Sequence, residues 1–208
     1  KIAPGEGVLS EEGSKLVPNS RAYWVVDPLD GTTNFAAGIP YWAISVARFV
    51  DGRPSEVFLD VPALRQRIVA LKGRGAFRNG EALTAETRLL ANSACVSLCS
   101  RSIRVLQRKP DQPFPGKIRL LGVASLNLVS VAMGQTLGAL EATPRIWDLA
   151  AAWLVLEELD CPIRWLGTDP SLLKPGQDLS QAPFPMLAAG SVAQLNRLLP
   201  WAEALSEG

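Results

Sequence analysis

The stretch Trp24-Val25-Val26-Asp27-Pro28-Leu29-Asp30-Gly31-Thr32-Thr33 decides how this chain is interpreted. The apolar run at residues 22–26 predicts a buried strand that ends at Asp27. Pro28 stiffens the following turn, and Asp30 comes three residues after Asp27, so the turn can aim both carboxylates at one point. Gly31 allows close backbone approach, and the N–H groups of residues 31–33 can line an anion site where a helix begins. Two acids beside such amides suit a divalent cation that bridges protein and phosphate.

The same stretch also fits an ordinary turn in which Asp30 or Thr32 caps a short helix. Two further acidic segments are equally ambiguous when each is taken alone. Ser10-Glu11-Glu12-Gly13 reads as a solvated acidic loop. In Trp147-Asp148-Leu149-Ala150-Ala151, the acid lies in the first turn of a predicted helix, where it would compensate the helix dipole. Local chemistry therefore leaves open whether these segments form a metal and phosphate site or are ordinary turns, loops and helix starts.

Composition narrows the classes of function. The 208 residues include 21 Lys or Arg, 20 Asp or Glu and no histidine, which excludes every mechanism that needs an imidazole from this chain. A net charge of +1 argues against a nucleic-acid or membrane-surface partner. We see no apolar run of about 18 residues and no signal peptide, so no membrane span is expected. Cys95, Cys99 and Cys161 match neither a disulfide framework nor a zinc pattern, and this fits a reducing cytoplasm.

Periodicity predicts a layered α/β fold in two parts. Residues 1–90 read as a loop followed by a mainly antiparallel sheet, with strands at 22–26, 42–50, 56–61 and 67–72 and turns at Asp51-Gly52 and Asn79-Gly80. Residues 91–208 alternate strands with helices. The strands are predicted at 94–99, 117–121, 137–142 and 185–189, and the helices at 100–107, 124–133, 147–159 (amphipathic) and 192–205 (interrupted at Pro200).

Taken together, four segments resemble the signatures of the inositol monophosphatase family, the lithium-sensitive, magnesium-dependent sugar-phosphate phosphatases. Residues 27–35 match its D-P-[ILV]-D-G-[ST]-x-N-[FY] pattern at every position, and residues 147–151 match W-D-x-A-A. Residues 10–13 resemble its G-E-E motif with Ser in place of the first Gly, and residues 73–80 resemble G-x-G-A-[FW]-x-N-G. The order and spacing of the four are far more specific than any one of them. The resemblance implies the αβαβα fold shared with fructose-1,6-bisphosphatase.

The resemblance also implies roles for individual residues. The expected ligands of two or three Mg²⁺ ions are Glu11, Asp27, the Leu29 carbonyl, Asp30 and Asp148. Thr32 would act with Glu11 to orient and deprotonate the attacking water, and Asp30 is also assigned to catalysis. The amides of Gly31 and Thr32 would hold the phosphate. On the substrate side, the expected residues are Gly122, Val123, Ala124, Glu141 and Arg145, of which Arg145 suits a second acidic group or simply faces solvent.

The predicted activity is hydrolysis of a small phosphate monoester, such as inositol monophosphate or a related sugar phosphate, with inhibition by Li⁺. Three sister activities stay open: those on fructose-1,6-bisphosphate, on a 3′(2′),5′-bisphosphate nucleotide and on histidinol phosphate. A degenerate member that only binds metal or sugar phosphate also stays open. Family members commonly form homodimers. They usually begin with two long helices before the G-E-E motif, and these helices are missing from this chain.

Overall fold

The structure, a computed structural model, describes residues 4–86, 93–108 and 111–205. Its strands form two sheets. The first has the order β1-β2-β3-β4-β5-β6-β7, with β1 (Gly7–Ser10), β2 (Ala22–Asp30), β3 (Ala43–Val50), β4 (Arg53–Val61), β5 (Gln66–Leu71), β6 (Gly75–Arg78) and β7 (Glu81–Leu83). The second has the order β11-β12-β10-β8-β9, with β8 (Cys95–Leu98), β9 (Lys117–Arg119), β10 (Gly138–Glu141), β11 (Ile163–Trp165) and β12 (Met186–Ala189).

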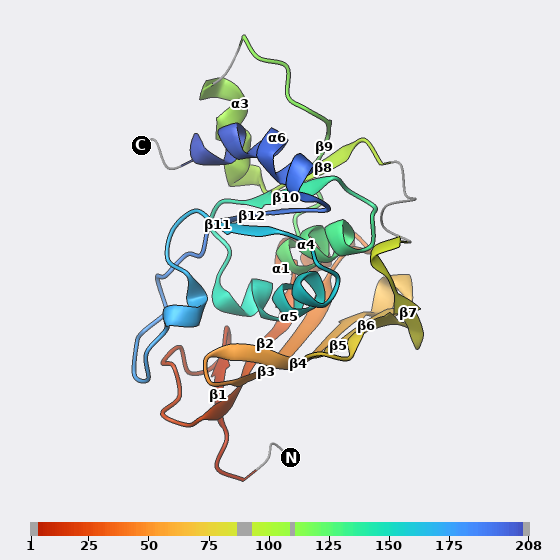
Figure 1. The fold of residues 1–208 in the computed structure, drawn as a ribbon. Helices are drawn as coiled ribbons and strands as arrows, with labels where there is room; N and C mark the ends of the chain where they lie inside the picture. The colour runs from red at the N-terminus through yellow and green to blue at the C-terminus, as the bar shows by residue number, and fades with distance from the viewer. Residues whose placement is uncertain (1–3, 87–92, 109–110, 206–208) are drawn as a thin grey trace.

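Helices fill the space between the two sheets and cover the second one (Figure 1). The helices are α1 (Thr32–Ala36), α3 (Arg104–Arg108), α4 (Ala124–Ala132), α5 (Ile146–Glu158) and α6 (Val192–Glu203). In the middle layer, α5 packs on β2–β6 and α4 packs on β8, β10 and β12. The outer face of the second sheet carries α3 and α6. The predicted layered α/β fold is therefore confirmed. Among the described residues, no helix covers the outer face of the first sheet.

The middle layer explains why α5 differs from its prediction. The pattern suggested an amphipathic helix, but ten of its 13 residues are buried. A helix enclosed between two sheets has almost no solvent-facing side, so its apolar stripe extends nearly all the way round. Small residues at 150–152 keep the helix close to its neighbours, and Trp153 packs edge-on against Phe49 and Trp165. This packing holds the start of α5, and with it Asp148, in one place.

Local predictions near both ends of the chain are wrong. Residues 1–20 were expected to be loop, but β1 pairs in parallel with β2 at the edge of the sheet. A four-residue strand that pairs with a distant segment leaves almost no periodic pattern in the sequence. The helix near the C-terminus was expected to be interrupted at Pro200, but α6 continues to Glu203. Pro200 lies near its end, where the missing N–H removes a single backbone hydrogen bond.

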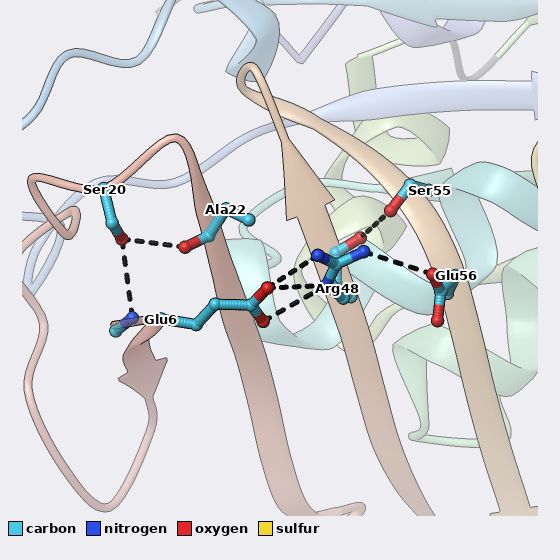
Figure 2. Close-up of polar contacts among 7 residues, drawn as sticks. Glu6, Ser20, Ala22, Arg48, Ser55 and Glu56 are labelled. Atoms are coloured by element: carbon cyan, nitrogen blue, oxygen red, sulfur yellow. Dashed lines mark hydrogen bonds and ion pairs between the residues drawn. The ribbon is translucent and has the colours of Figure 1, made fainter. Parts of the chain in front are cut away.

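A polar cluster fixes the entrance to β1 (Figure 2). Arg48 on β3 donates from Nε and Nη2 to the Glu6 carboxylate, with Nη2 at 2.6 Å from Oε1, and from Nη1 to Glu56. Ser20 accepts from the Gly7 amide and donates to the Ala22 carbonyl. The chain just before β1 is thus held on two sides, and Glu11 follows directly after this strand.

No helix in the described part of the chain is long and apolar enough to cross a membrane. The proposed division at residue 90 falls within 87–92, outside the described residues, and remains a prediction.

Candidate metal and phosphate site

A bulge in β2 brings Asp27 and Asp30 to the same side of the sheet. Tyr23, Val25 and Asp27 alternate as buried residues, as expected for a strand with one face on the core. The register against β3 shifts between Asp27 and Asp30, and this extra residue turns Asp30 to the buried side as well. The prediction that the strand ends at Asp27 is wrong, since β2 continues to Asp30. Both side chains are nearly buried, with exposed fractions of 1% and 8%.

These aspartates line a pocket of about 210 Å³ where several elements meet. Its walls are Glu11 after β1, Asp27, Leu29 and Asp30 on β2, residues 31–33 at the start of α1, Gly122 before α4 and Asp148 on α5. All five residues that the resemblance assigns to metal binding therefore line one pocket. So do Gly31, Thr32 and Gly122, which it assigns to phosphate and substrate.

Backbone donors hold three of the carboxylates in place. The Leu29 amide donates to Asp27 Oδ1 at 2.9 Å. The Ser125 amide, in the first turn of α4, donates to Asp30 Oδ2 at 2.8 Å. The Arg145 amide donates to Asp148 Oδ2 at 2.7 Å. Each bond fixes the orientation of a carboxylate through one of its oxygens.

The pocket concentrates negative charge in a poorly hydrated place. Burial first, and then the charge of Asp30, raise the pKa of Asp27 to about 9. The same two causes raise the pKa of Asp148 to about 7. Burial raises the pKa of Asp30 to about 6, against the hydrogen bonds from Ser125. The ionised carboxylates repel one another, so a cation among them would favour the ionised form of all three.

The donor set fits a hard divalent cation. Among the described residues, no three Asp, Glu, Cys or His side chains are arranged to enclose a metal by themselves. Mg²⁺ does not need such a cage, because it keeps several waters and is usually bound by one or two carboxylates together with substrate phosphate. The pocket offers carboxylate oxygens, the Leu29 carbonyl and room for water and phosphate. The residues present therefore fit Mg²⁺.

Gly31 shapes the phosphate side of the pocket. Its φ of +91° is unfavourable for other residues, and a Cβ there would lie 2.7 Å from Val123 Cγ2. Thr32 follows at the start of α1 and donates from its hydroxyl to the Leu29 carbonyl at 3.3 Å. Asn34 donates from Nδ2 to the carbonyls of Tyr41 and Leu121. These bonds hold the start of α1 next to Gly122.

The other predicted substrate residues do not line the pocket. Glu141 is 2% exposed, and its Oε1 accepts from Asn127 Nδ2 at 2.8 Å; burial raises its pKa to about 8. Val123 is buried and packs near Gly31, and Ala124 begins α4. Arg145 precedes α5, and its Nη1 is buried with no hydrogen-bond partner among the described residues. Arg145 is thus partly enclosed by protein.

Sequence reasoning missed three residues that shape the site. Thr33 lines the pocket and was quoted only as a backbone donor. The Ser125 amide holds Asp30 and the Asn127 side chain holds Glu141, but the helix predicted at 124–133 gives neither residue a role. The available signal for Asn127 was its polarity, because a polar side chain on a helix buried on all sides needs a partner inside the protein. Ser125 acts through its backbone amide, a role that its residue type does not indicate.

Comparisons with known proteins identify the family of this chain. The family model of the inositol monophosphatase family matches residues 1–183. The chain is 35% identical over 167 residues to a histidinol-phosphatase of Mycobacterium tuberculosis, with 74% of this chain and 63% of that protein covered. It is 34% identical over 166 residues to an inositol-1-monophosphatase of Rhizobium meliloti, with coverage of 76% and 62%.

A solved structure of an IMPase/NADP phosphatase complexed with NADP and Ca²⁺ superimposes with a TM-score of 0.77 at 25% identity. The superposition covers 96% of this chain and 76% of that one. The chain spans about three fifths of the length of the curated relatives it matches. Because the family model covers well over half of the residues, the chain belongs to the inositol monophosphatase family.

Proposed function

We propose that this protein is a Mg²⁺-dependent phosphatase that hydrolyses a small phosphate monoester by direct attack of water. The observation that carries the proposal is the single pocket that unites Glu11, Asp27, Leu29, Asp30 and Asp148 beside the amides of residues 31–33. Family membership and the printed activities of the relatives support it. A degenerate, non-catalytic member is disfavoured because every residue expected as a ligand is present in the chain and lines the pocket.

In this proposal Glu11, Asp27, Asp30, Asp148 and the Leu29 carbonyl hold two or three Mg²⁺ ions. When bound, these ions supply charge neutralisation for the phosphate oxygens and lower the pKa of water. Charge neutralisation and positioning carry most of the rate in phosphate transfer.

The protein's own groups then act on the substrate. The amides of Gly31 and Thr32 bind and orient the phosphate. Glu11 and the Thr32 hydroxyl orient the attacking water, and its proton passes to the Glu11 carboxylate. A bond forms from the water oxygen to phosphorus as the bond to the ester oxygen breaks, and the leaving oxygen takes up a proton.

The substrate is proposed only as a chemical class. Inositol monophosphate or a related sugar phosphate is the first candidate for the substrate. The similarity to a histidinol-phosphatase and to an IMPase/NADP phosphatase keeps other phosphate esters open. The partly enclosed Arg145 next to Asp148 favours testing substrates with a second acidic group. Inhibition by Li⁺, a homodimer and a cytoplasmic location are part of the same proposal.

Asp27→Asn tests the mechanism. We expect Mg²⁺-dependent release of phosphate to fall by about 10²–10³-fold, because the substitution removes a charge from the centre of the pocket while keeping its shape. The circular dichroism spectrum of the variant should match that of the wild type. Asp51→Asn is the matched control, since Asp51 lies in an exposed hairpin turn and pairs only with Arg21 among the described side chains. Undiminished turnover in Asp27→Asn would sink the mechanism.

A further inference from the structure

Glu11 differs from the other carboxylates of the pocket in how it is supported. Asp27, Asp30 and Asp148 belong to β2 and α5, but Glu11 lies on a turn after β1. The turn is closed by bonds from the Ser10 amide to the Ser14 carbonyl at 2.9 Å and from the Gly13 amide to the Ser10 carbonyl at 3.2 Å. The Glu11 amide donates to the Val26 carbonyl at 3.3 Å. The negative charges of Asp148 and Asp30 repel the Glu11 carboxylate, so a further contact is needed to keep Glu11 in position.

Lys15 supplies a contact that reaches both sides of the pocket. Its Nζ donates to the Glu11 carbonyl at 2.6 Å. The same Nζ lies 5.9 Å from the centroid of the Trp147 ring, within the range of a cation–π contact. Trp147 is 3% exposed and directly precedes Asp148. One ammonium group thus connects the main chain of Glu11 with the residue beside Asp148.

The backbone of Lys15 is itself anchored to the distant C-terminal part of the chain. The Leu179 amide donates to the Lys15 carbonyl at 2.9 Å. Val17 is hydrogen-bonded to the same part of the chain. Its amide donates to the Gln177 carbonyl, and its carbonyl accepts from the Gly176 amide. Leu16 forms an isolated bridge with Asp178. With its backbone fixed in this way, the Lys15 side chain starts from a defined point.

We propose that Lys15 is a positioning residue that holds Glu11 in the pocket it shares with Asp148, where both residues serve the proposed binding of Mg²⁺. The proposal rests on the proposed function, because it concerns the use of the same pocket. It makes Lys15 neither a metal ligand nor a catalytic group.

The direction in which Mg²⁺ affinity changes on substitution of Lys15 distinguishes a positioning role from a purely electrostatic one. A lysine near the pocket repels Mg²⁺, so its removal by Lys15→Met would strengthen binding if charge were its only effect. If Lys15 positions Glu11, the same substitution releases the turn and weakens binding. A purely structural role would lower the unfolding midpoint of the metal-free protein and leave the Mg²⁺ affinity of the folded protein unchanged.

The experiment titrates Mg²⁺ alone into the protein by isothermal titration calorimetry. We expect Lys15→Met to weaken Mg²⁺ binding about tenfold and to raise the Mg²⁺ concentration for half-maximal phosphate release by the same factor, with kcat at saturating Mg²⁺ within about threefold of the wild type. Lys15→Arg keeps a cation over the ring and should restore most of the affinity. Lys15→Gln, a shorter uncharged side chain, provides a second test should Lys15→Met not fold. Lys174→Met, at an exposed lysine of the C-terminal segment, is the control and should bind as the wild type does.

Unchanged or tighter Mg²⁺ binding by folded Lys15→Met or Lys15→Gln overturns the positioning role and leaves the proposed function standing. A wild-type protein that binds no Mg²⁺ overturns both.

Discussion

At the residue scale, the carboxyl groups of the pocket resist ionisation because they are buried. A bound cation would favour their ionised form. Burial is the first cause of the raised pKa values of Asp27 and Asp148 in the pocket, about 9 and 7, and of Glu141 outside its lining, about 8. Their ordinary values lie near 4. At pH values between about 4 and these raised pKa values, the folded protein binds more protons than the unfolded chain does. The free energy of unfolding of the metal-free protein must therefore fall as pH rises through this range.

This linkage predicts how Mg²⁺ and pH act together. With a chelator present, we expect the unfolding midpoint to be lower at about pH 8 than at about pH 5.5. Mg²⁺ favours the ionised carboxylates and competes with their protons, so it should raise the midpoint more at the higher pH. Differential scanning fluorimetry at both pH values checks this, with Asp27→Asn expected to lose most of the Mg²⁺ effect. Equal Mg²⁺ shifts at the two pH values would contradict the assignment.

Motif residues of the site could be predicted from the sequence, but their supports could not. Asp27 and Asp30 lie in one short segment, and the order of motifs linked them to Glu11 and Asp148. Asn127 and Ser125 act across the fold on side chains 14 and 95 residues away. Such contacts leave no spacing pattern in a single sequence, because they arise only when α4 docks beside β2 and β10.

At the scale of elements, the sequence predicts the tight turns but not the edge strands β1 and β11. Asp51-Gly52 and Asn79-Gly80 all have positive φ, as a two-residue hairpin turn of type I′ requires. This chemistry is local, so the sequence reveals it. In contrast, β1 and β11 contain four and three residues, and their pairing depends on strands already placed by the rest of the fold.

The end of α5 supports the β5–β6 hairpin through Glu158. The Gly73 amide donates to Glu158 Oε1 and the Gly75 amide to Oε2, both at 2.7 Å. Glu158→Gln keeps one acceptor oxygen and loses the charge, so we expect it to lower the free energy of unfolding by about 1–2 kcal/mol. Urea denaturation measures this. Glu81→Gln, on exposed β7, serves as the control and should change stability by less than about 0.5 kcal/mol. Equal effects of the two substitutions would mean that Glu158 does not support the hairpin.

At the scale of the whole molecule, one core joins both sheets. It contains Val25 from the first sheet, Met186 from the second, and Leu128 and Leu154 from the helices between them. The pocket follows the same plan, since Glu11 and Asp27 come from one part of the chain and Asp148 from the other. A residue in the middle layer should thus support both sheets and the pocket at once.

Leu154→Ala tests this coupling. Leu154 is fully buried on α5, and its truncation should lower the free energy of unfolding by about 2–5 kcal/mol. If the middle layer unites the molecule, amide hydrogen exchange in β3 and in β10 should accelerate by the same factor, because both open through the same global unfolding. Calorimetry should still give a single transition with equal calorimetric and van't Hoff enthalpies. Faster exchange in β3 alone would mean that residues 1–90 and 91–208 unfold as separate units, and the metal site would then depend on how the two dock.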